Sequence, residues 1–501
     1  MIKFKNNEHK IIILIMAFFL LIYCTISIVN HYYFRTYSLD LGLHNHAMYD
    51  YRNFRLNYSL LLMPLFNTRN QLSDHFDLMV VILSPLSFLF GSYTLLLVQI
   101  AAVIFGGLGV YKYFKSKCLP NSNIPIFALI HFYSIWGIYS ALSFDYHSNV
   151  IGAMLVPWYL YFFSKKNIRL TIVFFMLIIM CKEIMGLWLF FINLGLLIQD
   201  RKDKVLVKRS ITFGIVSLLY FYIMISFIIP ALSPSGNNYI HFSFDVLGKT
   251  PKEAILTILT RFQYVFTLLF ESNNPNPNSF AIKTELHLYI LLAGGFALFL
   301  KPQYLIMLIS IYAQKLYNSD PCKWGLNYHY SIEFVPIITF ALFTWVIEND
   351  NIINKVKYAI ILNIIAFAST MASLDHRYSF YYDRTRASFF DQRHYTQHFD
   401  VKLMHKILNN IPSNAKISAS SALVPHLSFR DTIYTFPTRI NADLILIIKT
   451  RSSTFPQTQK EFEGSLKNIK NDTLNYSKIY DNNELLIYQN KKYLNTINFT
   501  N

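Results

Sequence analysis

Residues 11–29 read "IIILIMAFFLLIYCTISIV", and this stretch decides the class of fold. A run of about 19 apolar residues is long enough to cross a bilayer as a helix. Three lysines, Lys3, Lys5 and Lys10, precede the run, and no small-residue cleavage site follows it. We therefore expect a retained transmembrane helix with its N-terminus in the cytoplasm, and not a cleaved signal peptide.

The composition of the whole chain also indicates a membrane protein. Of its 501 residues, 53% are hydrophobic, 17% are aromatic and only 15% are charged, which is too few charges for an ordinary soluble domain. The formal net charge of +17 could suggest nucleic acid, but lysine and arginine occur in short clusters between apolar runs, as the positive-inside rule requires. Nucleic-acid binding is therefore not expected. The four cysteines are scattered without a C-x-x-C pair, which supports neither a disulfide framework nor a zinc site.

Apolar runs recur along residues 1–371, and basic clusters close alternate runs. We therefore predict a mostly α-helical polytopic domain with about 11 transmembrane helices. The predicted spans are 11–29, 93–111, 124–142, 150–163, two short runs within 170–198, 211–230, 286–300, 303–314, 331–347 and 356–371. Residues 77–91, interrupted by Pro85, are predicted as an interfacial or re-entrant helix, and residues 231–285 as a polar outer loop.

The composition changes at about residue 372, where apolar spans disappear. Short β-type runs alternate from there with a helical stretch near 396–410, and these runs are "KISAS", "TIYTF", "DLILIIK" and "LLIYQ". We predict two domains: a transmembrane domain at 1–371, with a first outer loop at 30–92, and an α/β domain at 372–501. An odd number of spans places this C-terminal domain outside the cytoplasm.

Ionisable residues collect at the outer ends of the predicted spans. Such groups are expensive near lipid and tend to persist only where they face a cavity or one another, so a cluster drawn from five loops predicts a functional site. The residues are Asp40, His44, His46, Asp50, Asp74, His75, Asp77, Asp145, His147, Lys182, Glu183, Tyr328, His329 and Glu333.

Simpler structural roles stay open for several members of this cluster. Asp40 could be a helix N-cap beside Gly42. His44 and His46 are two residues apart, so they would share a face only on an extended segment, where they could bind a metal together. Lys182 and Glu183 could neutralise one another near lipid.

The same pieces, in this order, resemble a family of prokaryotic membrane proteins catalogued as domain of unknown function 2079. The resemblance covers nearly the whole chain. The matching stretches are "LDLGLHNHAMYD", "DHFDLMVVILSPL", "FDYHSN", "CKEIMGLW", "SALVPHLSFRDTIYTFP" (421–437) and "NADLILI". This family in turn looks like the GT-C glycosyltransferases, polytopic enzymes that move a sugar from a polyprenyl-phosphate carrier to an acceptor at the outer face of the membrane.

The resemblance implies a GT-C-like fold and a site for a polyprenyl-phosphate-linked sugar. GT-C enzymes commonly use a carboxylate of the first outer loop as catalytic base or metal ligand, and Asp40 matches it here. Inverting sugar transfer needs such a base, together with cations or a metal that hold the departing phosphate. The predicted donor-phosphate or substrate-binding residues are His44, His75, His147, Lys182, Glu183, His329, His426 and Arg430. Asp40 and Asp74 are the predicted ligands of a divalent cation, Mg or Mn.

In the outer domain, Pro425, His426, Ser428 and Arg430 are predicted to lie on a strand-to-loop transition. These residues could cap the active site or grip an acceptor. Buttressing of the outer loops is the alternative, and the sequence does not choose between the two.

The leading hypothesis is an integral inner-membrane glycosyltransferase of a prokaryote that transfers a hexosyl or pentosyl group to a glycan, lipid or protein acceptor. Its partners are then the lipid bilayer and a polyprenyl-phosphate-linked sugar. A transporter or flippase of lipid-linked glycans is the first alternative, although it should carry charges deep inside several spans. A non-catalytic envelope-assembly scaffold is the second, because Leu39 and Leu41 flank Asp40 where GT-C enzymes commonly have paired acidic residues.

Overall fold

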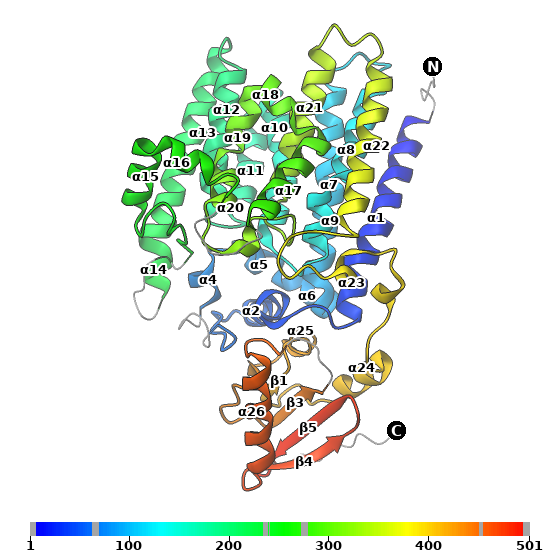
Figure 1. Cartoon of the computed structure of the whole chain (residues 1–501), viewed down its shortest axis with the longest axis vertical. Coiled ribbons are helices and arrows are strands. Elements are labelled where there is room, and N and C mark those ends of the chain that lie inside the picture. Colours follow the sequence, from blue (N-terminus) through cyan, green and yellow to red (C-terminus); the bar gives the residue numbers. More distant parts are fainter. Residues whose placement is uncertain are drawn as a thin grey trace. The chain divides into compact units, whose positions relative to one another are not determined.

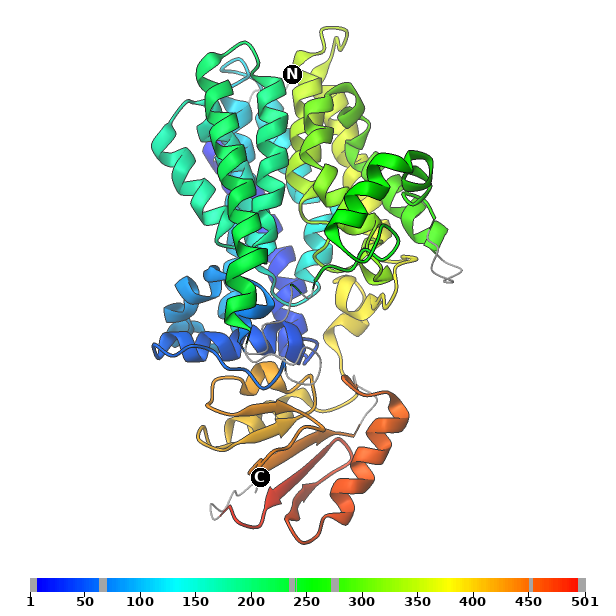
Figure 2. The same ribbon diagram turned by 90° about the vertical axis from the view of Figure 1, so that its left-hand side faces the viewer.

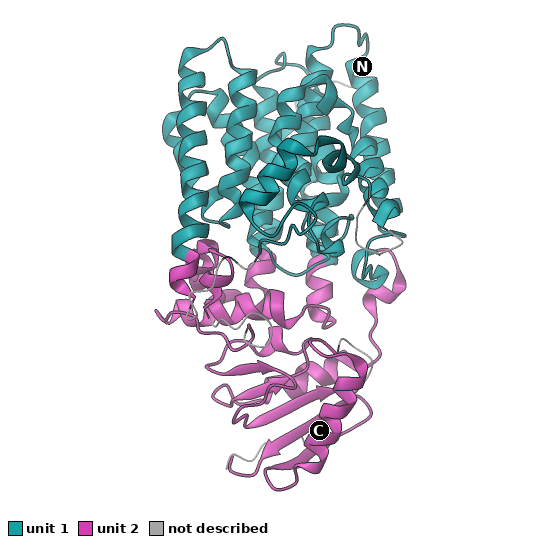
Figure 3. Cartoon of the chain, turned by 60° about the vertical axis from the view of Figure 1, so that its left-hand side comes forward, with its two compact units in different colours: residues 1–26, 98–228, 238–389 teal, residues 27–97, 229–237, 390–501 magenta. Residues whose placement is uncertain are grey.

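The structure is a computed structural model that describes residues 7–62, 70–233, 239, 241–271, 279–449 and 454–493. The chain divides into two compact units (Figure 3). Unit 1 comprises Met1–Ile26, Val98–Ile228 and Asn238–Phe389, and unit 2 comprises Ser27–Leu97, Ile229–Asn237 and Phe390–Asn501.

Unit 1 is helical, and most of its longer helices lie side by side (Figures 1 and 2). Its helices are α1 (Glu8–Tyr32), α7 (Thr94–Lys115), α8 (Ile124–Ser134), α9 (Trp136–Leu142), α10 (Ser148–Ser164), α11 (Ile168–Ile179), α12 (Ile184–Gln199), α13 (Lys204–Ile223), α15 (Pro251–Thr260), α16 (Phe262–Thr267), α17 (Ser279–Ile290), α18 (Ala297–Leu300), α19 (Pro302–Met307), α20 (Ile309–Leu316), α21 (Phe334–Glu348), α22 (Lys355–Ser373) and α23 (Arg384–Ala387). The last turn of α1 and the start of α7 belong to unit 2.

Four helical segments are long and apolar enough to cross a membrane by themselves: Glu8–Tyr32, Leu78–Lys115, Lys204–Leu232 and Lys355–Ser373. The pair α8 and α9, bent by 43°, would make a fifth span. The other predicted spans coincide with helices of 17 residues or fewer. The count of about 11 spans therefore stays a prediction.

The segment predicted as a polar loop at 231–285 contains the helices α15 and α16, so that prediction was wrong in part. A small core of Leu247, Ala254, Val265 and Leu268 holds the two helices together. The apolar residues of α15 and α16 are too few for a span, and for this reason the segment was predicted as a loop.

Unit 2 contains a mixed five-stranded sheet with the strand order β2-β1-β3-β5-β4. The strands are β1 (Ile417–Ala419), β2 (Ile433–Thr435), β3 (Leu444–Ile448), β4 (Tyr476–Asp481) and β5 (Leu485–Asn490). β1 is parallel to β2 and β3, whereas β5 is antiparallel to β3 and β4. The four predicted strand runs are thereby confirmed as strands, and the sequence analysis missed β4 and the helix α26 (Gln459–Asn471).

Alternation along β3 buries both faces of this sheet. Ile445 and Ile447 pack with Phe462 and Ile469 of α26, whereas Leu444 and Leu446 face a second core. Figure 2 shows α26 beside the sheet. The second core includes α24 (Val401–Asn409), which the sequence predicted near 396–410, and α25 (Val424–Leu427). A sheet covered on both faces explains why β3 is an unbroken apolar run.

The first outer loop belongs to the same unit and supplies part of this second core, through Phe34, Leu43, Leu61 and Leu62. Its elements are the π-helical turn η1 (Ser38–Gly42), α2 (Leu43–Arg52), α4 (Gln71–Asp74), α5 (Leu78–Leu83), the 3-10 turns η2 (Ser84–Leu86) and η3 (Gly91–Tyr93), and α6 (Ser87–Phe90); α14 (Ile229–Leu232) also lies in unit 2. The predicted boundary between residues 371 and 372 stays a prediction.

The predicted interfacial stretch 77–91 is a helix interrupted at Pro85, which lies in η2. Its end is set by Gly91, whose φ of +51° lies in the left-handed region. The position of this broken helix at a membrane interface stays a prediction.

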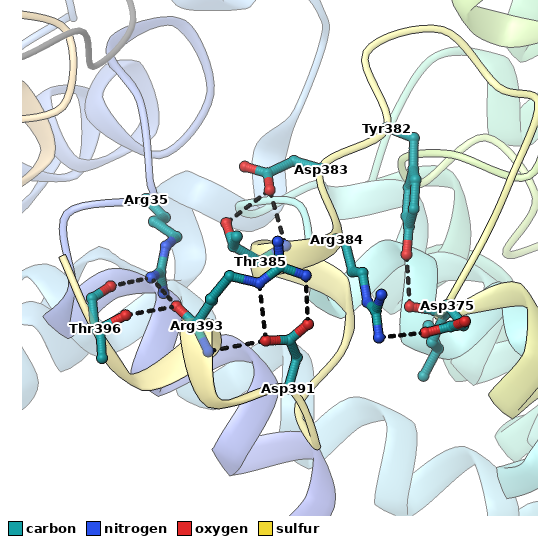
Figure 4. Close-up of polar contacts among 10 residues, drawn as sticks. Arg35, Asp375, Tyr382, Asp383, Arg384, Thr385, Asp391, Arg393 and Thr396 are labelled. Carbon is teal, nitrogen blue, oxygen red and sulfur yellow. Dashed lines mark hydrogen bonds and ion pairs between the residues drawn. The ribbon is translucent and has the colours of Figure 1, made fainter. Parts of the chain in front are cut away.

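Arginines fix the chain around residue 390 within each unit (Figure 4). In unit 2, Arg35 donates hydrogen bonds to the carbonyl oxygens of His394 and Arg393, at 2.6 and 2.9 Å. In unit 1, an exposed ion pair joins Arg384 to Asp375 at 2.5 Å. The residues next to the boundary between the units are thus ordered by polar contacts inside their own unit.

Candidate functional site

Asp40 lies in the π-helical turn η1, directly after the end of α1. Short π-helical turns occur frequently at functional sites. The turn is anchored at both ends: the Ser38 hydroxyl is 3.0 Å from that of Ser421, and Gly42 packs so closely on Val424 that a Cβ at residue 42 would lie 2.9 Å from its Cγ1. Gly42 itself is the N-cap residue of α2, so Asp40 is not the N-cap of that helix.

The imidazole of His44 connects Asp40 to a second carboxylate. His44 Nδ1 is 2.7 Å from the Asp40 carbonyl oxygen, and its Nε2 is 4.0 Å from Asp77 Oδ2. Asp77 is buried, and its Oδ1 accepts a hydrogen bond from the Met79 amide as the N-cap of α5. The structure thus brings His44 together with Asp40 and Asp77, while the Asp40 carboxylate stays half-buried.

Asp74 and His75 lie at the end of α4, and both side chains are half-buried. The His75 carbonyl accepts a hydrogen bond from the Asp77 amide at 2.8 Å, which connects the end of α4 to the N-cap residue of α5. Carboxylate oxygens suit Mg²⁺ or Mn²⁺. A cation held by Asp40 or Asp74 stays a prediction.

His46 does not share a face with His44. It is buried, and its Nδ1 lies 3.3 Å from the Ser59 hydroxyl and 3.4 Å from Asn57 Nδ2. Burial lowers its pKa, and the nearby Asp50 opposes that shift. These contacts give His46 a structural position inside unit 2.

A second group of polar residues lies in unit 1, where two loops carry stacked rings. The imidazoles of His147 and His329 stack with ring centroids 3.4 Å apart. Phe144 extends the stack on the His147 side at 5.3 Å, and Tyr330 extends it on the His329 side at 4.1 Å. We call Phe144, His147, His329 and Tyr330 the aromatic stack.

Each end of the aromatic stack carries a cation. The Arg386 guanidinium lies over the Phe144 ring at 5.1 Å, and the Lys323 ammonium lies over the Tyr330 ring at 5.6 Å. Both distances are within the range of cation–π attraction. The stack is therefore a row of rings between two positive charges.

The loops under the stack are held in special backbone conformations. Asp145 and Tyr328 have positive φ angles, +22° and +61°, which non-glycine residues adopt rarely. Gln99 fixes the first loop, because its side chain donates to the Asp145 carbonyl and accepts from the His147 amide, at 3.1 and 3.0 Å. Asp145, fully buried, pairs with Arg386 at 3.0 Å. Unusual backbone angles that are held in place by several contacts are typical of functional sites.

Two half-buried lysines lie near this group. In the part of the chain that the structure describes, neither Lys182 nor Lys323 forms an ion pair with a carboxylate. Burial lowers the pKa of Lys323, Asp320 opposes this, and Lys182 is close enough to lower that pKa further. The neighbouring Glu183 accepts a hydrogen bond from the Tyr239 hydroxyl at 2.8 Å, so the lysine and the glutamate do not simply neutralise one another.

Three buried cations of unit 1 were missed by the sequence analysis: Lys283, Lys315 and Arg377. Lys315 Nζ donates to the carbonyls of Lys323 and Gly325, at 2.8 and 2.6 Å. Lys283 Nζ likewise donates to the carbonyls of Leu268 and Leu316, and Arg377 donates to the carbonyl of Leu326. For Lys283 and Lys315 the available signal was a cation within an apolar helix, since charge near lipid usually has a specific partner, whereas Arg377 follows the end of α22.

His426 and Arg430 of unit 2 lie on and just after the short helix α25, so the predicted strand-to-loop transition was wrong. The imidazole of His426 stacks on that of His31 with centroids 4.1 Å apart. Arg430 is buried and donates to the carbonyls of Leu427, Pro412 and Ala415, and burial lowers its pKa to about 10. These contacts fit the buttressing interpretation, whereas a role in acceptor binding stays a prediction.

These observations define the class: a mostly helical chain with several apolar spans and a small mixed sheet near its C-terminus. The chain belongs to the family described as Predicted membrane protein (DUF2079), whose sequence profile matches residues 30–487. The resemblance noted from the sequence is thereby confirmed.

No curated protein matches the chain. Among solved structures, the chain is similar to the oligosaccharyltransferase of Archaeoglobus fulgidus in its apo form and in a form tethered to an acceptor peptide with the NVT sequon. In both comparisons the identity is 12%, the TM-score is 0.44 and 86% of this chain is covered. The chain spans 65% and 64% of the length of the two solved chains.

Proposed function

We propose that the protein is a GT-C-like membrane glycosyltransferase that moves a sugar from a polyprenyl-phosphate donor to an acceptor at the extracytoplasmic face. The observation that carries the proposal is the aromatic stack of unit 1, with cations at both ends and Lys182 nearby. Such a set of donors and charges fits a phosphate group.

The charge arrangement favours an anionic ligand. Lys182 is close enough to Lys323 to lower its pKa, although Asp320 raises that pKa, and among the described residues neither lysine forms an ion pair with a carboxylate. A partly desolvated like-charge pair is unfavourable until an anion neutralises it. The imidazoles of His147 and His329 add further hydrogen-bonding nitrogens to this group.

Asp40 is the proposed catalytic base. Its carboxylate takes the proton of the acceptor hydroxyl while the acceptor oxygen forms a bond to the anomeric carbon. The bond between that carbon and the donor phosphate oxygen breaks, and its electron pair leaves with the polyprenyl phosphate. The anchored turn at Ser38–Gly42 supports this role because a base must be held in one geometry.

His44 and Asp77 are proposed to orient the Asp40 turn, since the His44 ring bonds the Asp40 carbonyl. Lys182 and Lys323, with the imidazoles, are proposed to stabilise charge on the departing phosphate. A divalent cation on Asp40 or Asp74 would serve the same end, and loss of activity in EDTA with recovery in Mg²⁺ or Mn²⁺ would support it.

The test is transfer of radiolabelled sugar from a pooled polyprenyl-phosphate-sugar fraction to a membrane extract by purified, reconstituted protein. Asp40→Asn should lower transfer by about 10²–10⁴-fold, the range for loss of a general base. Asp350→Asn is the matched control, because Asp350 is an exposed aspartate in the turn between α21 and α22.

Transfer that survives in Asp40→Asn would remove Asp40 as the base. No transfer by the wild type, together with intact binding of the lipid carrier, would overturn the glycosyltransferase proposal. Equal elution of all three proteins in size-exclusion chromatography controls for folding.

A further inference from the structure

The helical hairpin α15 and α16 in unit 1 has a large exposed apolar surface. Ile255 and Leu259 in α15, and Phe262 and Phe266 in α16, are each four residues apart, so each pair lies on one face of its own helix. Leu259 is 76% exposed and Phe262 is 74% exposed. With Leu256, these residues form what we call the hairpin patch.

The patch is not a poorly folded segment. Ala254 and Val265 point to the opposite side, where they pack with Leu247 and Leu268. Lys283, fully buried, donates a 2.6 Å hydrogen bond to the Leu268 carbonyl just after α16. The hairpin is therefore held with its apolar residues outward.

Three threonine hydroxyls of the hairpin are hydrogen-bonded within it. The Thr260 hydroxyl donates to the Leu256 carbonyl at 2.7 Å, and the Thr267 hydroxyl donates to the Tyr264 carbonyl at 2.8 Å. At the start of α15, the Thr250 hydroxyl accepts a hydrogen bond from the Glu253 amide. Internally bonded hydroxyls are what a lipid environment requires, because lipid tails offer no partner.

Cations lie beside the patch and at its centre. Lys249 and Lys252 are exposed before and at the start of α15, next to the exposed Glu253, and Arg261 is exposed between the two helices. An apolar surface that carries more cations than anions is complementary to a bilayer surface, where acyl chains lie beneath anionic headgroups. A protein partner would more commonly leave hydroxyls and charges to be paired across the interface.

We propose that α15 and α16 form a monotopic hairpin that lies in the bilayer interface, with the hairpin patch in the acyl region of one leaflet. This inference is independent of the proposed sugar transfer. The Tyr239 hydroxyl donates a hydrogen bond to Glu183, and the chain continues from Tyr239 to this hairpin. The backbone therefore connects the proposed lipid contact with Glu183.

The test uses a single fluorescent label on the full chain reconstituted in vesicles of phosphatidylcholine and phosphatidylglycerol. The four native cysteines are replaced by serine, and Leu259→Cys carries an environment-sensitive dye. Leu474→Cys is the matched control, since Leu474 is 88% exposed in the segment before β4. At residue 259 the dye should be quenched by lipid-borne doxyl groups at a depth of about 5–10 Å and should lose quenching by aqueous iodide. At residue 474 the pattern should be reversed.

Iodide quenching at residue 259 equal to that at residue 474, without doxyl quenching, would overturn the proposal. If the cysteine-free chain does not fold, wild-type protein can be crosslinked to a phosphatidylcholine with a photoactivatable group near the glycerol. Crosslinks on residues 255–266 would support the hairpin, and crosslinks confined to the four long apolar segments would overturn it.

Discussion

The imidazole of His147 stacks on the imidazole of His329 with their centroids 3.4 Å apart. The stack joins loops nearly two hundred residues apart in the chain. A change in the position of either loop would therefore disturb the contact between the two rings.

The first prediction concerns the energy of this contact. His147→Ala and His329→Ala should be coupled by about 0.5–1.5 kcal/mol in stability, because each substitution removes the same ring contact. Thermal unfolding of the two single variants and the double variant, each purified in detergent, measures the coupling. Additive losses would mean that the rings contribute independently.

The second prediction concerns the pair of Asp145 and Arg386. The Asp145 side chain is fully buried and that of Arg386 is 11% exposed, so Arg386→Met leaves a buried carboxylate without its cation. We expect a loss of about 3–5 kcal/mol, with partial recovery when Asp145→Asn is added. The matched control is Arg384→Met, whose ion pair with Asp375 is about half exposed and contributes roughly 0–1 kcal/mol.

Thermal melting of the wild type and the three variants separates the two cases. Equal small losses for Arg386→Met and Arg384→Met would show that the Asp145 carboxylate is solvated and that the loop under the aromatic stack is not fixed by this pair.

The third prediction concerns Gly42. A Cβ at this position would lie 2.9 Å from the branched, buried Val424 side chain, so Gly42→Ala should lower the melting temperature by the equivalent of about 1–3 kcal/mol. Gly214→Ala in α13 is the control, because its nearest atoms are 3.7 Å away and alanine favours a helix. Its melting temperature should hold or rise. A neutral Gly42→Ala would mean that η1 does not pack closely on α25.

Sequence patterns predicted the helical class, the short strands and the outer-loop residues because each depends on local chemistry. Nineteen apolar residues specify a span wherever they occur, and alternating apolar residues specify a strand. His147 and His329 could be selected for the same reason, since polar groups at span ends need partners.

Contacts between distant segments could not be predicted from one sequence. Nothing in "LDLG" indicates that Gly42 meets Val424, and nothing near His329 indicates that Lys315 holds its loop through backbone carbonyls. These contacts depend on the packing of whole elements. The hairpin α15–α16 was missed for a different reason, because its apolar residues are too few for a span and were assigned to a loop.

The fourth prediction concerns pH. Burial lowers the pKa of His426 well below its ordinary 6.5, and the nearby His31 and His405 lower it further. The ring is therefore neutral in the folded chain, while the unfolded chain takes up a proton as pH falls below about 6.5. Stability from this group is present above that pH and is lost below it, by up to about 1.4 kcal/mol per pH unit.

Melting temperatures of wild type and His426→Phe at pH 7.5 and 5.5 test this prediction. The phenylalanine keeps a ring against His31 but cannot be protonated, so its melting temperature should fall less on acidification. An identical fall in both proteins would assign the pH dependence to other groups.

The fifth prediction concerns Lys323, which the sequence analysis did not single out. If the aromatic stack and Lys182 receive a phosphate, the Lys323 ammonium is one of its cations. Lys323→Met should then raise the KM for the polyprenyl-phosphate donor by about 10-fold or more, since a hydrogen bond to a charged group contributes about 1.5–3 kcal/mol. Lys323→Arg keeps the charge over Tyr330 and should retain most of the affinity.

Lys460→Met is the matched control, because Lys460 is an exposed lysine of α26, outside the aromatic stack and the hairpin patch. The discriminating measurement is binding of polyprenyl phosphate as a function of salt. The wild type and Lys323→Arg should weaken steeply as ionic strength rises, and Lys323→Met should show a shallower dependence because one charge contact is gone. Equal salt dependence for Met and Arg at residue 323 would place Lys323 outside the phosphate site and leave its ammonium a structural cap on the Tyr330 ring.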